Sequence, residues 1–240
     1  MPNRRARNSG LSAHERPARL GRTLAQGVVT FRVKHGLPEP PLLLVTDRGQ
    51  AQRPLEDILA AAFAAGCRWA SLREKDLPRA DQVALAKRLL PLARKAEATL
   101  TLHGDPALAR EAGVDGVHLP SGANAAAARA ALGAGALIGL SVHAGDDLQA
   151  IATADIDYLL AGPAFATESK PGYGPFFGTA GIAALARSTD LPVLAIGGIG
   201  PDNAADAMAA GAAGVAVMGG VMRAADPGAA VTALLRALGR

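Results

Sequence analysis

The sequence predicts a single (β/α)8 barrel, and three observations support this fold class. The chain has 240 residues, of which 50% are hydrophobic, and this size suits one α/β barrel with a large core. Only 3% of the residues are aromatic, so the core must consist of Ala, Val, Leu and Ile, which are typical of parallel strands buried on both faces. From residue 41 onward, short apolar segments alternate strictly with helical patterns, which indicates parallel strands joined by helical crossovers.

Eight apolar segments are expected to be strands, and the segments between them show helical spacing. Eight such units in about 200 residues favour a closed barrel over an open doubly wound sheet. The expected strands are 41–46, 68–72, 98–103, 114–118, 137–141, 157–161, 192–196 and 214–218. The expected helices are 53–65, 79–96, 106–112, 124–133, 146–153, 179–187, 201–210 and 228–238.

Local signals mark the ends of individual elements. Asp105 followed by Pro106 is a typical helix start, with a capping side chain before a proline in the first turn. The segments 111–119 and 209–218 each contain a helix end, a glycine turn and a buried strand. Glycine ends helices because it adopts the left-handed conformation without penalty.

Two regions differ in charge. Residues 1–40 carry eight basic and two acidic residues and are predicted to be a basic leader, partly disordered or forming a short extra element. Residues 41–240 form the predicted barrel domain and are close to neutral, which is not typical of nucleic-acid-binding domains. No apolar run is long enough to span a membrane. We therefore expect neither nucleic acid nor membrane as a partner, and leave a homo-oligomer open. The single cysteine, Cys67, excludes an intrachain disulfide and fits the cytoplasm.

The candidate site lies in the residues that follow each strand, because active sites of such barrels are at the carboxyl ends of the strands. Gly197-Gly198 follows the seventh expected strand and Gly219-Gly220 the eighth. Glycine lets phosphate oxygens approach backbone N–H groups, and the loops after strands 7 and 8 are the usual phosphate site of this fold. The glycine pairs therefore predict a phosphate site, with tight turns as the alternative interpretation.

Cations follow other strands. Arg73 and Lys75 lie two residues apart, so strand alternation directs both side chains the same way. They would suit a diphosphate or a carboxylate, or form a solvated charge cluster. Lys170 lies in the Gly/Pro-rich loop TESKPGYGP, which would either cover a substrate or form a flexible surface loop.

Several further polar residues end strands. His103, His118 and His143 are candidates for general acid or base catalysis, with hydrogen-bonded structural histidines as the alternative. Asp105 is a candidate Mg²⁺ ligand, since Mg²⁺ is held by one or two carboxylates together with substrate phosphates. The local sequence favours Asp105 as a helix cap instead.

Seven segments, in this order, resemble the thiamine phosphate synthase/TenI superfamily over about residues 41–236. They are LLLVTDR (42–48), SLREKD (71–76), DGVHLPSG (115–122), GLSVH (139–143), DYLLAGPAFATESKPG (157–172), PVLAIGGI (192–199) and GAAGVAVMGGV (211–221). The resemblance implies a (β/α)8 barrel that acts in thiamine biosynthesis. In the synthase, a pyrimidine diphosphate loses pyrophosphate and a thiazole phosphate captures the resulting cation.

The resemblance also implies a role for each matching residue on phosphorylated small-molecule substrates. On the pyrimidine side these are Arg73 and Lys75 as diphosphate ligands, Ser141 on the pyrophosphate, Thr167, Ser169 and Lys170 as the loop that closes on the phosphates, and Asp105 as a Mg²⁺ ligand. Within that loop, Lys170 would stabilise the leaving pyrophosphate. On the thiazole side, Gly198, Gly219 and Gly220 would cradle the phosphate.

This sequence departs from the superfamily pattern at several positions. Ser71 replaces a glutamine, and His103-Gly104 replaces an Asn-Asp pair. Ala123 stands where the second metal carboxylate is expected. A thiazole tautomerase would have its catalytic histidine where this chain has Pro163. Three activities therefore remain open: a synthase, a tautomerase-like isomerase in which one of the strand-end histidines moves the proton, and a non-catalytic barrel that binds phosphorylated ligands.

Overall fold

The computed structural model describes residues 36–147, 151, 153–167 and 174–240. The described residues belong to one compact unit, and within it eight parallel strands close into a barrel in sequence order. The predicted (β/α)8 fold is therefore confirmed. The strands are β1 (Leu42–Val45), β2 (Trp69–Leu72), β3 (Thr99–His103), β4 (Gly116–Leu119), β5 (Leu137–Val142), β6 (Tyr158–Ala161), β7 (Val193–Ile196) and β8 (Gly214–Val217).

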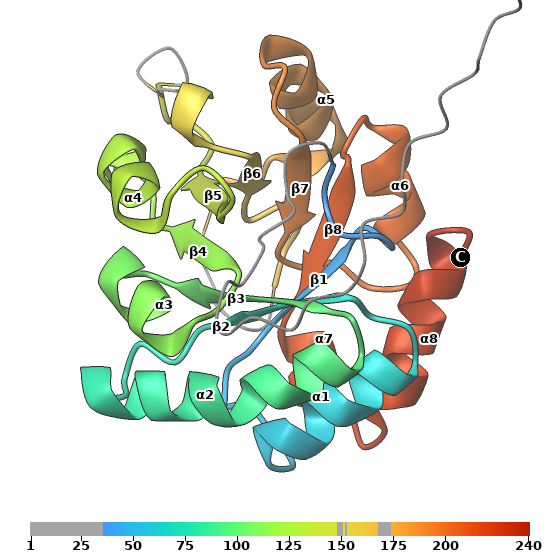
Figure 1. Cartoon of the computed structure of the whole chain (residues 1–240). Helices are drawn as coiled ribbons and strands as arrows, with labels where there is room; N and C mark the ends of the chain where they lie inside the picture. The colour runs from blue at the N-terminus through green and yellow to red at the C-terminus, as the bar shows by residue number, and fades with distance from the viewer. Residues whose placement is uncertain (1–35, 148–150, 152, 168–173) are drawn as a thin grey trace, which may run out of the picture. The chain divides into compact units, whose positions relative to one another are not determined.

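Helices surround this barrel (Figure 1). Closure occurs between the first and last strands, where Leu42 is in register with Val215. All strands run in the same direction, so their carboxyl ends meet at one mouth. The helices are α1 (Leu55–Ala64), α2 (Arg79–Lys95), α3 (Pro106–Ala112), α4 (Ala125–Leu132), η2 (Thr153–Asp155, a 3-10 turn), α5 (Gly178–Ser188), α6 (Ala204–Ala209), α7 (Gly219–Met222) and α8 (Pro227–Ala237).

The predicted cap of α3 is confirmed. The Asp105 carboxylate accepts the N–H of Ala107 at 2.7 Å, and Gly113 ends the helix with a φ of 71°. Such a side-chain cap satisfies one of the donors that a helix start leaves without a partner, and contributes about 1 kcal/mol.

Two predictions about helices were wrong. The helix expected over 146–153 is not formed by the residues described there: Asp146, Asp147 and Ile151 lie outside regular structure, and the 3-10 turn η2 follows instead. Residues 148–150 and 152 lie outside the described residues. Conversely, the glycine pair after β8 was expected as a loop but begins the short helix α7. It forms despite the low helix propensity of glycine because Val221 and Met222 are fully buried.

The core has two parts. The larger part consists of aliphatic side chains between the strands and the helices. The smaller part fills the barrel interior and includes Leu43, Val45, Leu160 and Leu194 from β1, β6 and β7. Polar side chains are also fully or almost fully buried on the neighbouring strands, namely Ser71, Thr101 and His118. The barrel therefore has an unusually polar interior below the mouth, where branched aliphatic residues normally dominate.

Among the described residues, no helix combines the length and the apolar character needed to cross a membrane. The leader prediction concerns residues 1–40, most of which lie outside the described residues. It stays a prediction, although β1 begins at Leu42, next to the expected boundary.

Candidate active site

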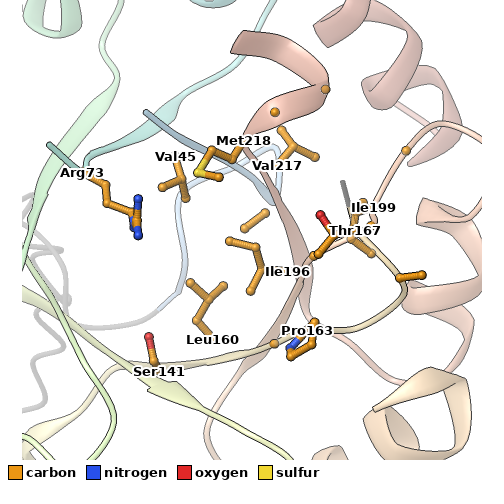
Figure 2. A pocket seen from close by; sticks show the side chains of 18 of the residues that line it. Val45, Arg73, Ser141, Leu160, Pro163, Thr167, Ile196, Ile199, Val217 and Met218 are labelled. Carbon is orange, nitrogen blue, oxygen red and sulfur yellow. The ribbon is translucent and has the colours of Figure 1, made fainter. Parts of the chain in front are cut away.

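A cavity of about 600 Å³ lies at the carboxyl ends of the strands. Figure 2 shows side chains from separate elements around it, with Arg73 on one side and Thr167 on the other. The cavity gathers most of the residues that the sequence singled out: Arg73, Lys75, His103, Ser141, His143, Thr167, Gly198, Gly219 and Gly220. The predicted cations of β2 and the predicted glycine loops therefore share one mouth.

Two predicted residues of the described part of the chain are not part of this lining. His118 is buried, and Asp105 lies outside the cavity. Ser169 and Lys170 lie outside the described residues, so their predicted roles stay predictions.

Arg73 is the half-buried cation of the site. Its backbone N–H donates to Thr46 Oγ1 at 3.0 Å, which fixes the start of the loop after β2. Among the residues that the structure describes, none forms a hydrogen bond or an ion pair with its guanidinium. A half-buried guanidinium normally has an anionic partner, because desolvating a charge is costly. The guanidinium therefore lines the cavity as a positive charge that no described residue neutralises.

Glu74 braces the loops below this cation. It is only 3% exposed, and it accepts a hydrogen bond from Thr46 Oγ1 at 2.6 Å and from the N–H of Arg48 at 3.0 Å. Burial raises the pKa of the Glu74 carboxyl, and the two hydrogen bonds oppose this shift. Its carboxylate joins the loops after β1 and β2, so we assign it a structural role. Glu74 lies in the segment SLREKD, but nothing in that segment indicated that its side chain joins these two loops.

A pH-dependent stability is expected from Glu74. Because its pKa is raised in the folded protein, the folded state holds the proton more tightly than the unfolded chain does. The wild type should therefore lose stability as the pH rises from about 4.5 through the raised value. Glutamine does not titrate, so Glu74→Gln cannot show this loss of stability. The melting temperature of the variant should therefore approach that of the wild type as the pH rises above about 4.5. Thermal unfolding across this range measures it, and a constant difference between the two melting temperatures would contradict the assignment.

The loop after β7 has a shape that only glycine permits. Gly197 and Gly198 have φ values of 97° and 66°, and a Cβ at Gly198 would lie 2.2 Å from the carbonyl oxygen of Ala166. Asn203 locks the loop, since its Nδ2 donates to the Gly198 carbonyl at 2.8 Å and its Oδ1 accepts the N–H of Gly200 at 2.9 Å. The backbone of this loop thus closes tightly on the loop after β6.

The segment after β8, which begins α7, completes the glycine-lined side of the cavity. Gly219 is buried and Gly220 is exposed, and a Cβ at Gly220 would meet nothing within 4 Å. Arg223, one turn further, also lines the cavity and donates to Gln50. Sequence reasoning missed Arg223 and Asn203, although both belong to the two loops that it identified.

The three candidate histidines differ in their environments. His103 and His143 line the cavity, and Nδ1 of His143 lies 3.6 Å from the Asp146 carboxylate. Burial, and to a lesser extent the charge of Lys75, lowers the pKa of His118 to about 3. His118 therefore stays neutral at physiological pH and reaches no ligand directly, which argues against its predicted role as an acid or base acting on substrate.

The residues at the implied metal positions do not form a Mg²⁺ site. One oxygen of Asp105 accepts the N–H of Ala107, and the other is paired with Arg79; this pairing lowers the pKa of Asp105. Gly104 has a φ of 124°, a conformation that an aspartate rarely adopts, and position 123 is alanine. In the described part of the chain, no three metal-ligating side chains cluster. The Mg²⁺ expectation stays a prediction that these residues do not support.

Comparisons with known proteins agree with this geometry. The family model described as thiamine monophosphate synthase matches residues 42–221. The chain is 40% identical over 199 residues to a putative thiamine-phosphate synthase of Geobacter sulfurreducens, covering 82% of this chain and 93% of that protein. It is 43% identical over 195 residues to the thiamine-phosphate synthase of a Roseiflexus species, covering 80% and 82%.

Two further matches concern a fused protein and a solved structure. The chain is 43% identical over 180 residues to the thiamine biosynthesis bifunctional protein ThiM/ThiE of Symbiobacterium thermophilum, covering 75% of this chain but only 38% of that protein. The structure of thiamine phosphate pyrophosphorylase from Pyrococcus furiosus superimposes with a TM-score of 0.73 at 28% identity, covering 82% of this chain and 95% of that chain.

Proposed function

This chain belongs to the thiamine monophosphate synthase family, and on that premise we propose that it joins a pyrimidine diphosphate to a thiazole phosphate with release of pyrophosphate. It is thus a transferase of thiamine biosynthesis, acting on small phosphorylated substrates. The proposal concerns only the segment of this chain that matches the bifunctional relative, which is 38% of that protein. A cytoplasmic location stays a prediction.

The observation that carries the proposal is the half-buried guanidinium of Arg73, which has no partner among the described residues and shares a cavity with the glycine loop after β7 and the glycine pair that begins α7. A cationic side and a backbone-amide side fit two phosphorylated substrates bound together. Arg73 and Lys75 are placed to hold the diphosphate, while the amides around Gly198 and Gly219 suit a single phosphate.

The reaction follows from this arrangement, in which the diphosphate lies on the cationic side of the cavity and the thiazole phosphate on the backbone-amide side. The carbon–oxygen bond between the pyrimidine methylene and its diphosphate breaks, and pyrophosphate leaves with the electron pair. The thiazole nitrogen then forms a new bond to the carbocation. Fixed positive charge stabilises the departing anion more than the bound substrate. The apolar side of the cavity, with Val45, Leu160 and Ile196, excludes water that would otherwise capture the cation.

A direct assay tests the function. Purified full-length protein with both substrates should release pyrophosphate in step with the formation of thiamine phosphate. Absence of both products, with Mg²⁺ present, would refute the proposal.

An isomerase is the second candidate function, because His103 and His143 line the cavity. Isomerisation of a thiazole phosphate carboxylate without metal would favour it, if this activity were lost in His103→Ala or His143→Ala.

Asp105→Asn separates the two roles considered for Asp105. Asparagine caps helices as well as aspartate does, so the variant keeps the cap and loses only the charge. The lost partner of Arg79 is a surface ion pair, which contributes at most about 1 kcal/mol. We therefore expect pyrophosphate release to stay within about twofold of wild type across a Mg²⁺ titration. A large increase in the Mg²⁺ concentration needed for activity would instead identify Asp105 as a metal ligand.

A further inference from the structure

Three polar side chains connect the barrel interior to the cavity. Nδ1 of His118 lies 3.1 Å from the hydroxyl oxygen of Tyr158, and Nε2 lies 2.8 Å from Oγ of Ser141. Tyr158 is fully buried and His118 is 1% exposed. Of the three, only Ser141 lines the cavity. His118 and Tyr158 can therefore act on a ligand only through the serine.

The position of Tyr158 is tightly fixed. In the sheet, His118 is in register with Gly139 and Gly139 with Tyr158. Gly139 makes room for the phenol, since a Cβ at that position would lie 2.0 Å from its Cζ. The Trp69 ring packs edge-on against the phenol at 4.9 Å between centroids. The glycine and the tryptophan thus hold the phenol hydroxyl against the imidazole.

The positions of the protons in the hydrogen bonds among Tyr158, His118 and Ser141 determine which tautomer of His118 is present. In the described residues, His118 Nδ1 is the hydrogen-bond partner of the Tyr158 hydroxyl, and His118 Nε2 is that of the Ser141 hydroxyl. If the phenol donates to Nδ1, the neutral imidazole carries its proton on Nε2 and donates it to Ser141. In the opposite tautomer the phenol proton would be buried without an acceptor, which is costly.

We propose that Tyr158 fixes His118 as the Nε2–H tautomer, and that His118 thereby leaves the Ser141 hydroxyl free to donate its proton to an anion in the cavity. Tyr158 and His118 are positioning residues, and the identification of the anion as the departing pyrophosphate rests on the proposed function. The lowered pKa of His118 supports a neutral ring. A hydroxyl directed in advance at developing negative charge stabilises a transition state without reorganisation.

The tautomer can be observed without any assay of activity. Protein labelled with ¹⁵N-histidine should show, for His118, a protonated Nε2 and an unprotonated Nδ1 at neutral pH. The resonances are assigned by their loss in His118→Asn. Tyr158→Phe removes the donor to Nδ1 and should shift both nitrogens toward the average of the two tautomers. A protonated Nδ1 in the wild type would overturn the proposal.

A double-mutant cycle tests the connection to Ser141. We expect Ser141→Ala to lower kcat for pyrophosphate release about thirtyfold and Tyr158→Phe about tenfold, with the double variant within about twofold of Ser141→Ala. If the losses in kcat of the two single variants instead multiplied in the double variant, the two residues would act independently and the proposal would be overturned. Ser141→Thr, which keeps a hydroxyl, should preserve the sensitivity to Tyr158→Phe.

The matched control is Thr101→Val, which deletes another buried hydroxyl of the barrel interior. Thr101 is fully buried, and its Oγ1 donates to the carbonyl of Ala70 and not to His118, Tyr158 or Ser141. This variant should keep kcat within about twofold and leave the His118 nitrogens unchanged. If the wild type releases no pyrophosphate, the proposed function fails, whereas the histidine spectra still decide the tautomer.

Discussion

Arg73→Ala is expected to lower kcat/KM for pyrophosphate release by two to three orders of magnitude. The guanidinium is half-buried and has no partner in the described part of the chain, so its charge has not been neutralised by the protein. Removing one fixed donor to an anionic transition state commonly reduces the rate by about 10²–10³, or about 2.7–4 kcal/mol. Because no internal ion pair is broken, we expect the melting temperature to change little.

Steady-state release of pyrophosphate measures this effect, and Arg79→Ala is the matched control. Arg79 is also an arginine on the carboxyl side of β2, but it is exposed, lies outside the cavity and is paired with Asp105. Its replacement should leave kcat/KM within about twofold. Equal losses in both variants would mean that general surface charge, and not a fixed guanidinium in the cavity, drives the reaction.

The fold was predictable because hydrophobic periodicity and turn residues agree along the chain. The continuous apolar run at 42–45 is typical of a strand buried on both faces, and it forms β1 with all four residues buried. Gly113 is a typical helix-ending residue, and it ends α3 in the left-handed conformation. The two wrong predictions about helices occur where the local sequence signals for secondary structure are weak. Nothing in the residues of α7 favours a helix, which forms because Val221 and Met222 find buried positions beside the barrel.

The rim of the site was predictable for a geometric reason. Parallel strands of a closed barrel bring their carboxyl ends to one mouth, so residues such as Arg73 and Gly198, 125 positions apart, must meet. What lies beneath the rim was not predictable. Glu74, His118 and Tyr158 all lie in segments that the sequence singled out. Their contacts, Glu74 with the loop after β1 and His118 with Tyr158, depend on side-chain packing between strands, which sequence patterns do not specify.

Gly198→Ala is expected to damage the site by displacing a loop, without removing any functional group. The added Cβ would lie 2.2 Å from the Ala166 carbonyl oxygen, and it would also have to accept a φ of 66°. The second cost alone is about 1–2 kcal/mol for an L-residue. Because backbone cannot yield as a flexible side chain does, the loops after β6 and β7 must separate, which moves the amides proposed to hold the thiazole phosphate.

This displacement should act on one substrate more than on the other. We expect kcat/KM for the thiazole phosphate to fall by about two orders of magnitude, mostly through KM, while binding of inorganic pyrophosphate at the Arg73 side changes only a few-fold. Gly200→Ala is the control, since it adds the same methyl group to the same loop but meets nothing within 4 Å; we expect a loss of at most about threefold. Similar losses for Gly198→Ala and Gly200→Ala would show that the close approach to Ala166 is irrelevant to phosphate binding, and an equal loss of pyrophosphate affinity would place both anions on the same loop.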